Sequence, residues 1–251
     1  GLSGTLDTAV GAQDHQIPTL AFVMFQMTFA IITVALLSGA IADRAKFGAW
    51  VIFVAVWITI IYAPIAHWAF ASQGASGGWI VDKLGALDFA GGTVVEINSG
   101  AAGLALAVVL GKREGFRRDP MRPHNVPFIL LGAGLLWFGW FGFNAGSAVA
   151  SNATAGVTFL NTFVATGAAM LSWLLVEKVR DGRATSLGAA SGVVAGLVAI
   201  TPSCSSVNPL GAMGLGAIAG VLCALAVGLK YKFSSNMFAK VGYASTSGDT
   251  S

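Results

Sequence analysis

Seven long apolar runs dominate this 251-residue chain. At about 1.5 Å per helical residue, such runs match the roughly 30 Å hydrocarbon core of a bilayer. Hydrophobic residues make up 55% of the chain and charged residues only 10%, an apolar excess that a soluble core of this size does not need. We therefore predict an all-α fold, a polytopic bundle of membrane helices. The predicted spans are 19–41, 48–71, 89–110, 127–149, 157–177, 187–203 and 210–229.

The basic residues between these spans predict how the chain is oriented. They follow the first, third, fifth and seventh spans, whereas the loops after the second, fourth and sixth spans contain only Lys83. By the positive-inside rule, this multi-pass protein of the cell membrane has its N-terminus outside and its C-terminus in the cytoplasm. The basic loop residues are Arg44, Lys46, Lys112, Arg113, Arg117, Arg118, Arg122, Lys178, Arg180, Arg183, Lys230 and Lys232.

Other classes of function find no support in the residues. The net charge of +3 comes from the short basic loops and does not indicate a nucleic-acid surface. Cys204 and Cys223 are separated by most of an apolar span and indicate neither a disulfide framework nor a metal site. Because the chain contains no nucleophile elbow, phosphate-binding glycine loop or paired metal ligands, we expect neither an enzyme nor a bound cofactor.

Glu96 is the one charged residue of the third span. A charged side chain near the middle of a bilayer costs roughly 2.5–3.5 kcal/mol on insertion scales. We therefore expect Glu96 to face the protein interior or a pore and to have a function there.

Several long motifs carry a resemblance to a known family. They are FQMTFAIITVALLSGAIADRAKFGAW (25–50), AHWAF (66–70), DFAGGTVVEINSG (88–100), WFGWFGFNAGSA (137–148) and ATSLGAASGVVAGLVAITP (184–202). Through them the chain resembles the ammonium transporter (Amt/Mep/Rh) family, most closely its bacterial Amt branch, as far as about Phe233. The resemblance implies a fold of eleven spans, built as two inverted five-helix repeats and a final helix. We expect a partial chain that corresponds to the third to ninth spans and lacks the first two and last two.

The family's outer binding site suits the chemistry of ammonium. Ammonium is a small, strongly hydrated cation, so a selective site must replace its water with aromatic faces and a few acceptors. The resemblance places Phe25, Trp68 and Ser147 at such a recruitment site. An aromatic belt at the membrane interface is the alternative explanation for Trp68. A helix N-cap explains Asp88 most simply, and the resemblance adds that this carboxylate shapes the site from beneath without touching the cation.

Two phenylalanines are candidates for a pore constriction. By their motifs, Phe29 and Phe143 correspond to the paired phenyl rings that close the family's pore below the outer site. Phe25 and Phe29 are four residues apart, as are Phe143 and Ser147, so each pair shares one helix face. Core packing is the alternative explanation for such a pair. A hydrophobic constriction favours loss of the charge before passage, because hydrocarbon admits ammonia more readily than the cation.

At Glu96 the sequence departs from the bacterial pattern. Most family members have a histidine here, paired with a second histidine from the tenth span, and the two relay a proton in the pore; some fungal members have glutamate. A carboxylate also accepts and donates a proton, so the resemblance implies a proton-relay role for Glu96. No histidine follows His124, so these residues do not complete the pair. The alternative is a substitution tolerated in a chain that is no longer selected for transport.

The resemblance implies transport of ammonium or ammonia through a hydrophobic pore, after recruitment and deprotonation of the cation, by a homotrimer with one pore per protomer. Its implied partners are the lipid membrane and a cytosolic signalling protein at the inner face. An ammonium-sensing membrane domain is one alternative, and a truncated family member without transport of its own is another. We expect residues 1–233 to form the partial membrane domain, and residues 234–251 to form a polar cytoplasmic tail with little structure of its own.

The predicted orientation can be tested by chemical labelling. We expect a cysteine placed in the loop 149–156 to react with an impermeant maleimide on intact cells, and one placed at 114–119 to remain unlabelled, because the positive-inside rule puts these loops on opposite sides. The background chain has Cys204 and Cys223 replaced by alanine, and permeabilised cells control for reactivity. Labelling of 114–119 but not of 149–156 would reverse the topology.

Overall fold

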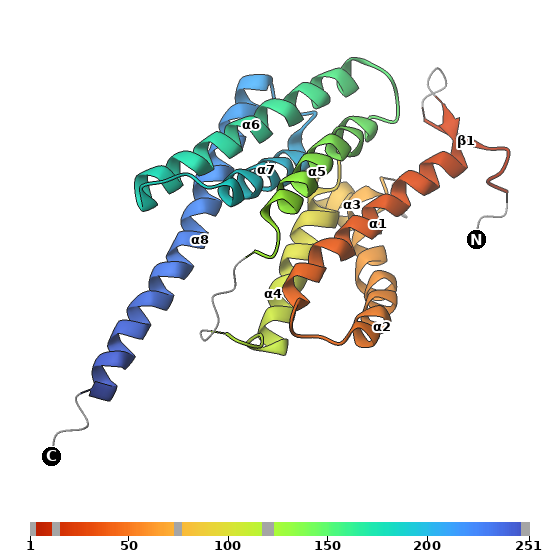
Figure 1. Cartoon of the computed structure of the whole chain (residues 1–251). Helices are drawn as coiled ribbons and strands as arrows, with labels where there is room; N and C mark the ends of the chain where they lie inside the picture. The colour runs from red at the N-terminus through yellow and green to blue at the C-terminus, as the bar shows by residue number, and fades with distance from the viewer. Residues whose placement is uncertain (1–3, 12–15, 73–76, 117–122, 247–251) are drawn as a thin grey trace.

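Each of the seven predicted spans is a helix in the computed structural model of the chain (Figure 1). The structure describes residues 4–11, 16–72, 77–116 and 123–246, with side chains as far as Val227. Three spans differ from the prediction by three residues or more at an end: the third helix begins at Gly92 rather than 89, the fourth ends at Gly146 rather than 149, and the fifth extends beyond 157–177 at both ends. The membrane-length helices are Thr19–Ile41, Phe47–Phe70, Gly92–Leu110, Val126–Gly146, Ala153–Asp181, Ser186–Ser203 and Pro209–Val227.

The second and third spans change pitch along their length. In the second span, α2 (Phe47–Trp57) continues through a π-helical turn, η1 (Ile58–Tyr62), into α3 (Ala63–Phe70). Pro64 near the start of α3 has no N–H to donate to the preceding turn, which accounts for the looser winding there. A short π-helical turn, η3 (Trp79–Lys83), lies between the two spans, and the third span begins with another, η4 (Gly92–Ile97), and continues as α4 (Asn98–Leu110).

Side-chain caps define where the next three helices begin. The caps of α5 (Val126–Gly146), α6 (Ala153–Asp181) and α7 (Ser186–Ile200) each satisfy a backbone N–H that the first helical turn leaves unbonded. The three bonds run from the N–H of Phe128 to Asn125 Oδ1 (3.0 Å), from the N–H of Ala155 to Asn152 Oδ1 (3.1 Å), and from the N–H of Gly188 to Thr185 Oγ1 (2.9 Å). After α7 a short 3₁₀ turn, η5 (Thr201–Ser203), leads toward α8 (Pro209–Thr246).

The helices form two groups with α5 between them (Figure 1). In one group α1 (Thr19–Ile41) packs against α4 and η4, and in the other α6 packs along both α7 and α8. α5 contacts α6 and α7 directly. Before α1, the short strands β1 (Ala9–Val10) and β2 (Ile17–Pro18) form an antiparallel pair in which Ala9 faces Pro18 and Val10 faces Ile17.

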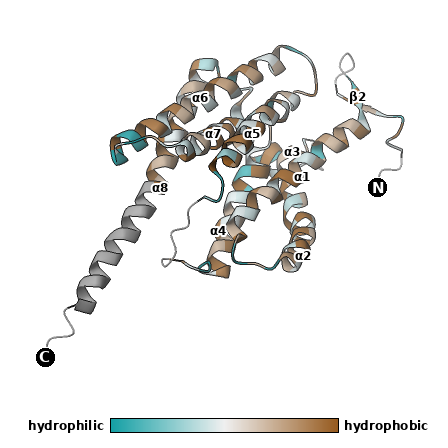
Figure 2. Ribbon diagram, viewed as in Figure 1, coloured by the Kyte–Doolittle hydropathy of each residue, from teal (hydrophilic) through white to brown (hydrophobic). Residues whose placement is uncertain are grey.

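Apolar residues also cover the outer faces of the helices, as a bilayer requires. Figure 2 shows hydrophobic colouring along the helices and hydrophilic colouring concentrated at their ends and in the connecting segments. Val109, Phe138 and Val179 are each more than three-quarters exposed in the isolated chain. Helices that are apolar on all sides are typical of membrane spans, so the fold confirms the predicted all-α polytopic bundle.

The C-terminal segment is more regular than we expected. α8 continues to Thr246, beyond the predicted span end at residue 229, so residues 234–246 are helical although we expected little structure there. No proline follows Pro209, so nothing in the sequence breaks the helix sharply. Residues 247–251 lie outside the described part of the chain. In Figure 1 the end of α8 projects away from the bundle.

The contact between α6 and α8 depends on a glycine. A Cβ added at Gly216 would collide with the backbone carbonyl of Ala165 on α6, whereas a Cβ at Gly214 on the same helix meets nothing within 4 Å. We expect Gly216→Ala to lower the free energy of unfolding by about 1–3 kcal/mol through overpacking. Gly214→Ala is the matched control and should be neutral or slightly stabilising, because alanine is the better helix former. Thermal unfolding in detergent measures both, and equal melting temperatures would contradict this close contact.

Candidate functional site

A cluster of aromatic rings joins α1 to α5. Phe25 and Phe29 lie one turn apart on α1 with ring centroids 4.9 Å apart, edge to face. Phe29 stacks on Phe143 of α5 at 4.3 Å, and Phe143 stacks in turn on Trp140 at 4.7 Å. Only 1% of the Phe29 surface is exposed. The structure therefore brings together the two phenyl rings that the sequence predicted as a constriction.

Phe143 occupies a central position in the packing. It contacts the buried clusters around Phe29, around Ile200 and around Leu197, which together include residues from all seven membrane-length helices. Its neighbours on either side in α5 are hydrogen-bonded to other helices: Trp140 Nε1 donates to Thr201 Oγ1 (2.9 Å) and Asn144 Nδ2 donates to Thr162 Oγ1 (3.0 Å). The ring is thus held by packing and by bonds that fix its helix.

Phe70 also belongs to this cluster, although the sequence analysis did not single it out. Its ring lies 6.1 Å from that of Phe29 in an edge-to-face arrangement. Trp68, the predicted member of the outer site, has its ring contact with Trp79 at 5.8 Å, and no ring contact in the described part of the chain joins it to Phe29. The two residues are two positions apart in the AHWAF motif, so a helix turns their side chains in different directions. The packing of α3 against α1 brings Phe70, and not Trp68, into ring contact with Phe29.

Ser147 directly follows Gly146, which lies next to the ring of Phe25. It follows the last residue of α5, and its Oγ donates to the carbonyl of Phe143 (2.8 Å). A Cβ added at the preceding Gly146 would stand 3.4 Å from the Phe25 ring. Since the hydroxyl proton is used within the helix, the oxygen of Ser147 keeps lone pairs with which it can accept a hydrogen bond.

Asp88 organises the turn that leads into the third span. Its carboxylate accepts the backbone N–H of Gly91 (3.0 Å) and of Thr93 (2.8 Å). We expected an N-cap, and the carboxylate does bind N–H groups at the start of the helix, but the cap position itself is Gly91, three residues later. Gly91 has φ +98°, and a Cβ there would approach the rings of Phe70 and Phe29 at 3.1 and 3.2 Å. The Asp88 turn therefore lies directly against the aromatic cluster.

Glu96 is buried within the π-helical turn η4. Only 8% of its surface is exposed, and neither carboxylate oxygen has a hydrogen-bond partner among the described residues. Tyr62, in the other π-helical turn of the membrane helices, and Asp88 are close enough to interact with it electrostatically. π-Helical turns are often found at functional sites, and a buried carboxylate without a partner is costly to keep. The prediction that Glu96 faces the interior is consistent with this position.

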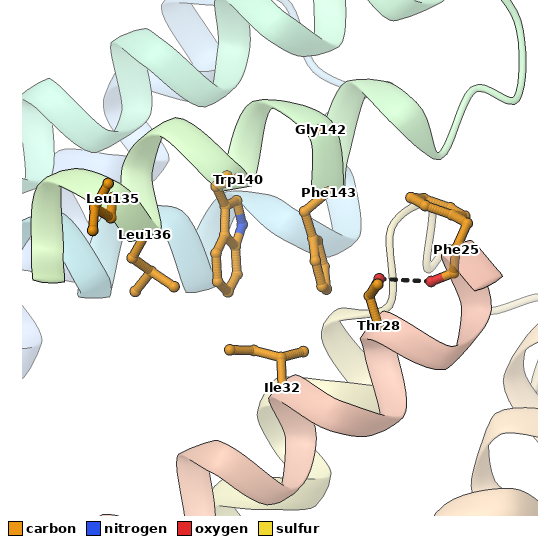
Figure 3. A pocket seen from close by; sticks show the side chains of 9 residues that line it. Phe25, Thr28, Ile32, Leu135, Leu136, Trp140, Gly142 and Phe143 are labelled. Carbon is orange, nitrogen blue, oxygen red and sulfur yellow. Dashed lines mark hydrogen bonds between the residues drawn. The ribbon is translucent and has the colours of Figure 1, made fainter.

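An apolar groove runs between α1 and α5 beside the aromatic cluster. Its volume is about 390 Å³, and Figure 3 shows Leu136, Trp140 and Phe143 directed from α5 toward α1. Thr28 is the hydroxyl-bearing residue of the lining, and its Oγ1 donates to the carbonyl of Phe25 (2.6 Å). The groove therefore offers a surface suited to an uncharged or apolar occupant. Its lining comes from Phe25, Thr28 and Ile32 of α1 and from Leu135, Leu136, Gly139, Trp140, Gly142 and Phe143 of α5.

Comparison with known proteins identifies the family. The profile of the Ammonium Transporter Family matches residues 1–236. The chain belongs to the ammonium transporter family. Among relatives of the family, an ammonium transporter of Mycobacterium tuberculosis is 66% identical over 219 residues, which is 86% of this chain and 46% of that protein. Ammonium transporter Amt1 of Archaeoglobus fulgidus is 45% identical over 232 residues, covering 92% of this chain and 56% of that protein.

Solved structures of ammonium transporters share the fold. Mep2 from Candida albicans has a TM-score of 0.77 and 39% identity over 85% of this chain and 47% of its own. A structure described as a sensor Amt protein has a TM-score of 0.77 and 36% identity over 86% of this chain and 55% of its own. The chain thus spans about half the length of these relatives. The resemblance inferred from the motifs is confirmed, and the family is one of membrane transporters rather than enzymes.

Proposed function

We propose that these helices form the part of an ammonium transporter that recruits ammonium at its outer end and passes it, after loss of a proton, as ammonia through an aromatic constriction. The observation that carries the proposal is the stacked pair of Phe29, which is buried against the Asp88 turn, and Phe143, which lines the groove. Two rings in contact exclude water. A cation that passes between them must give up its hydration, which costs far more free energy than it does for a neutral molecule.

Recruitment is assigned to the outer side of these rings. Phe25 presents an aromatic face one turn before Phe29, and Phe70 adds another ring from α3. Ser147, which follows the Gly146 that lies beside the Phe25 ring, offers an acceptor oxygen. Aromatic faces attract a cation by about 0.5–2 kcal/mol each, and an acceptor replaces part of the hydration shell. Asp88 contributes from beneath by holding the Gly91 turn against the rings. Trp68, with Trp79, forms the outer rim of the site in this proposal.

Deprotonation and proton transfer are assigned to Glu96. Its carboxylate is buried and makes no hydrogen bond to the described residues, so both oxygens are available to take up a proton. A side chain committed to a structural hydrogen bond would lose that bond on each cycle. Because no hydrogen bond holds the Glu96 carboxylate in its charged form, the uncharged, protonated form is also accessible. Charge is costly among membrane helices, which favours that form.

The remaining assignments follow from the sequence and the family. We place the N-terminus outside and the C-terminus in the cytoplasm, on the alternation of basic loops. We also propose assembly as a homotrimer and a cytosolic signalling partner at the inner face. The likeness to a sensor Amt protein supports one alternative, in which the same outer site binds ammonium for sensing rather than transport. The other alternative, a fragment without transport of its own, is distinguished by comparing this chain with a complete transporter.

A chimera provides the test of transport. In the chimera, the part of this chain that matches the M. tuberculosis ammonium transporter replaces the corresponding 219-residue stretch of that protein. The M. tuberculosis protein supplies the segments outside the match. Ammonium-evoked currents on a solid-supported membrane and uptake of labelled methylammonium are measured for the chimera, for this chain alone, and for the unaltered relative as the positive control. Saturable uptake by the chimera supports transport; ammonium binding without uptake or current would favour the sensing alternative.

The outer site predicts a difference between two neighbouring aromatic residues. In the chimera we expect Phe70→Leu to raise the half-saturating ammonium concentration about 2- to 30-fold, because the loss of one cation–π contact is worth about 0.5–2 kcal/mol. Trp68→Leu is the matched comparison from the same helix and should have the smaller effect, while uptake at saturating ammonium stays similar in both. A larger effect of Trp68→Leu would make Trp68 the principal aromatic residue of the site, as the motif predicts.

Substitutions of Glu96 test the proton-relay role. We expect Glu96→Gln to lower the current and flatten its pH dependence, because glutamine keeps the size of the side chain and loses the titrating group. Glu96→His should keep the current measurable and move its pH profile toward the range in which imidazole titrates. If the glutamine variant kept both the amplitude and the pH profile of the unchanged chimera, Glu96 would be a buried structural acid instead.

A further inference from the structure

A belt of fully buried polar side chains connects α5, α6 and α7. Six of them have no exposed surface at all, although they lie among membrane helices. In such a setting a polar group must find a partner, because no solvent is available to it. The six residues are Asn144, Thr158, Asn161, Thr162, Thr166 and Thr201.

The amide of Asn161 has a defined orientation. Its Nδ2 donates to the carbonyl oxygens of Cys204 (2.8 Å) and Val207 (2.7 Å), which tie α6 to the segment between η5 and α8. A carbonyl accepts hydrogen bonds and cannot donate them, so the nitrogen must point toward this segment. The Oδ1 of Asn161 therefore points the other way, and it has no partner among the described residues.

The amide of Asn144 is fixed by the same reasoning. Its Nδ2 donates to Thr162 Oγ1 (3.0 Å), and the proton of that hydroxyl goes to the carbonyl of Thr158 (2.8 Å). Since the Thr162 hydroxyl has already used its proton, it accepts from Asn144, which must present its nitrogen. The Oδ1 of Asn144 is then left over, again without a partner in the described part of the chain.

Thr158 supplies a third unused group at the same place. Its hydroxyl has no hydrogen-bond partner among the described residues, whereas those of Thr162 and Thr166 donate back along α6. Thr158, Asn161 and Thr162 lie within about one helical turn and share one face of α6. The Asn144 amide reaches that face of α6 through its hydrogen bond to Thr162. Two acceptor oxygens and one hydroxyl, all on fully buried residues, are therefore left without partners on linked faces of α5 and α6.

We propose that Asn144, Thr158 and Asn161 form a binding site for one internal water molecule. Water donates two hydrogen bonds and accepts from a hydroxyl, so it matches two amide oxygens and one O–H group, and buried waters commonly make about three such bonds. None of the three groups is charged, so a cation would exchange its hydration shell for neutral oxygens at a high cost. The site is separate from the aromatic cluster and does not rest on the proposed transport function.

The sign of a stability change tests this proposal. In the full chain purified in detergent, Thr158→Val keeps the shape and removes the hydroxyl. With the water bound, one hydrogen bond is lost, and we expect the melting temperature to fall by about 2–4 °C. With no water there, valine removes a buried unpaired hydroxyl, so an unchanged or raised melting temperature would overturn the proposal. Thr166→Val is the matched control, since it removes a satisfied hydroxyl of the same helix and shows that the assay detects one bond.

A density map tests for the water molecule directly and independently of the unfolding experiment. In a crystal or cryo-microscopy map that resolves internal waters elsewhere in the bundle, we expect a spherical peak about 2.6–3.2 Å from at least two of Asn144 Oδ1, Asn161 Oδ1 and Thr158 Oγ1. The peak should disappear in Thr158→Val or move away from residue 158. An empty site at that resolution, or a peak at about 2.3–2.4 Å from the oxygens as for a bound metal ion, would contradict a water site.

Discussion

The stacking of Phe29 on Phe143 is the contact on which the arrangement of the bundle depends. It is the direct ring contact between α1 and α5, and Phe143 at the same time packs against all three buried clusters. In a bilayer, helices gain little from burying apolar surface against one another, because lipid is equally apolar. Shape complementarity and specific bonds must then set their positions. The bonds of Trp140 and Asn144 on either side of Phe143 hold α5 against α7 and α6, so the ring has a fixed place toward which α1 can pack.

The turn from Asp88 to Gly91 makes that contact compatible with a helix beginning beside it. The carboxylate satisfies two N–H groups that would otherwise be buried without acceptors, and glycine permits both the positive φ and the approach of two phenyl rings. The N–H of Phe89 also bonds the carbonyl of Pro202 (3.0 Å), which fastens the turn to the end of α7. A single short segment thus links the aromatic cluster, the start of η4 with Glu96, and the far group of helices.

The sequence allowed the spans, the family and the pairing of Phe29 with Phe143 to be predicted, because hydropathy and long motifs are local properties. Span ends differed where a cap or a π-helical turn set the boundary, as at Asn152 and Gly92. The distinction between Trp68 and Phe70 was not predictable from the motif, since it depends on which side of α3 meets α1. The orientation of the Asn144 and Asn161 amides was not predictable either, because it follows from a hydroxyl 18 residues away for Asn144 and from carbonyls 43 and 46 residues away for Asn161.

Polar groups inside the bundle fall into two kinds, and the difference bears on function. Thr162, Thr166 and Thr201 return their protons to their own helices, and the asparagine amides tie helices together, so these groups are used for structure. Glu96 is also buried, with 8% of its surface exposed, yet it makes no such bond to the described residues. Were Glu96 structural, glutamine or an apolar residue of similar size would remove the cost of a buried acid without losing any contact seen here. A structural role would offer the Glu96 carboxylate no bond among the described residues, and this supports the proposal that its proton, rather than its shape, serves transport.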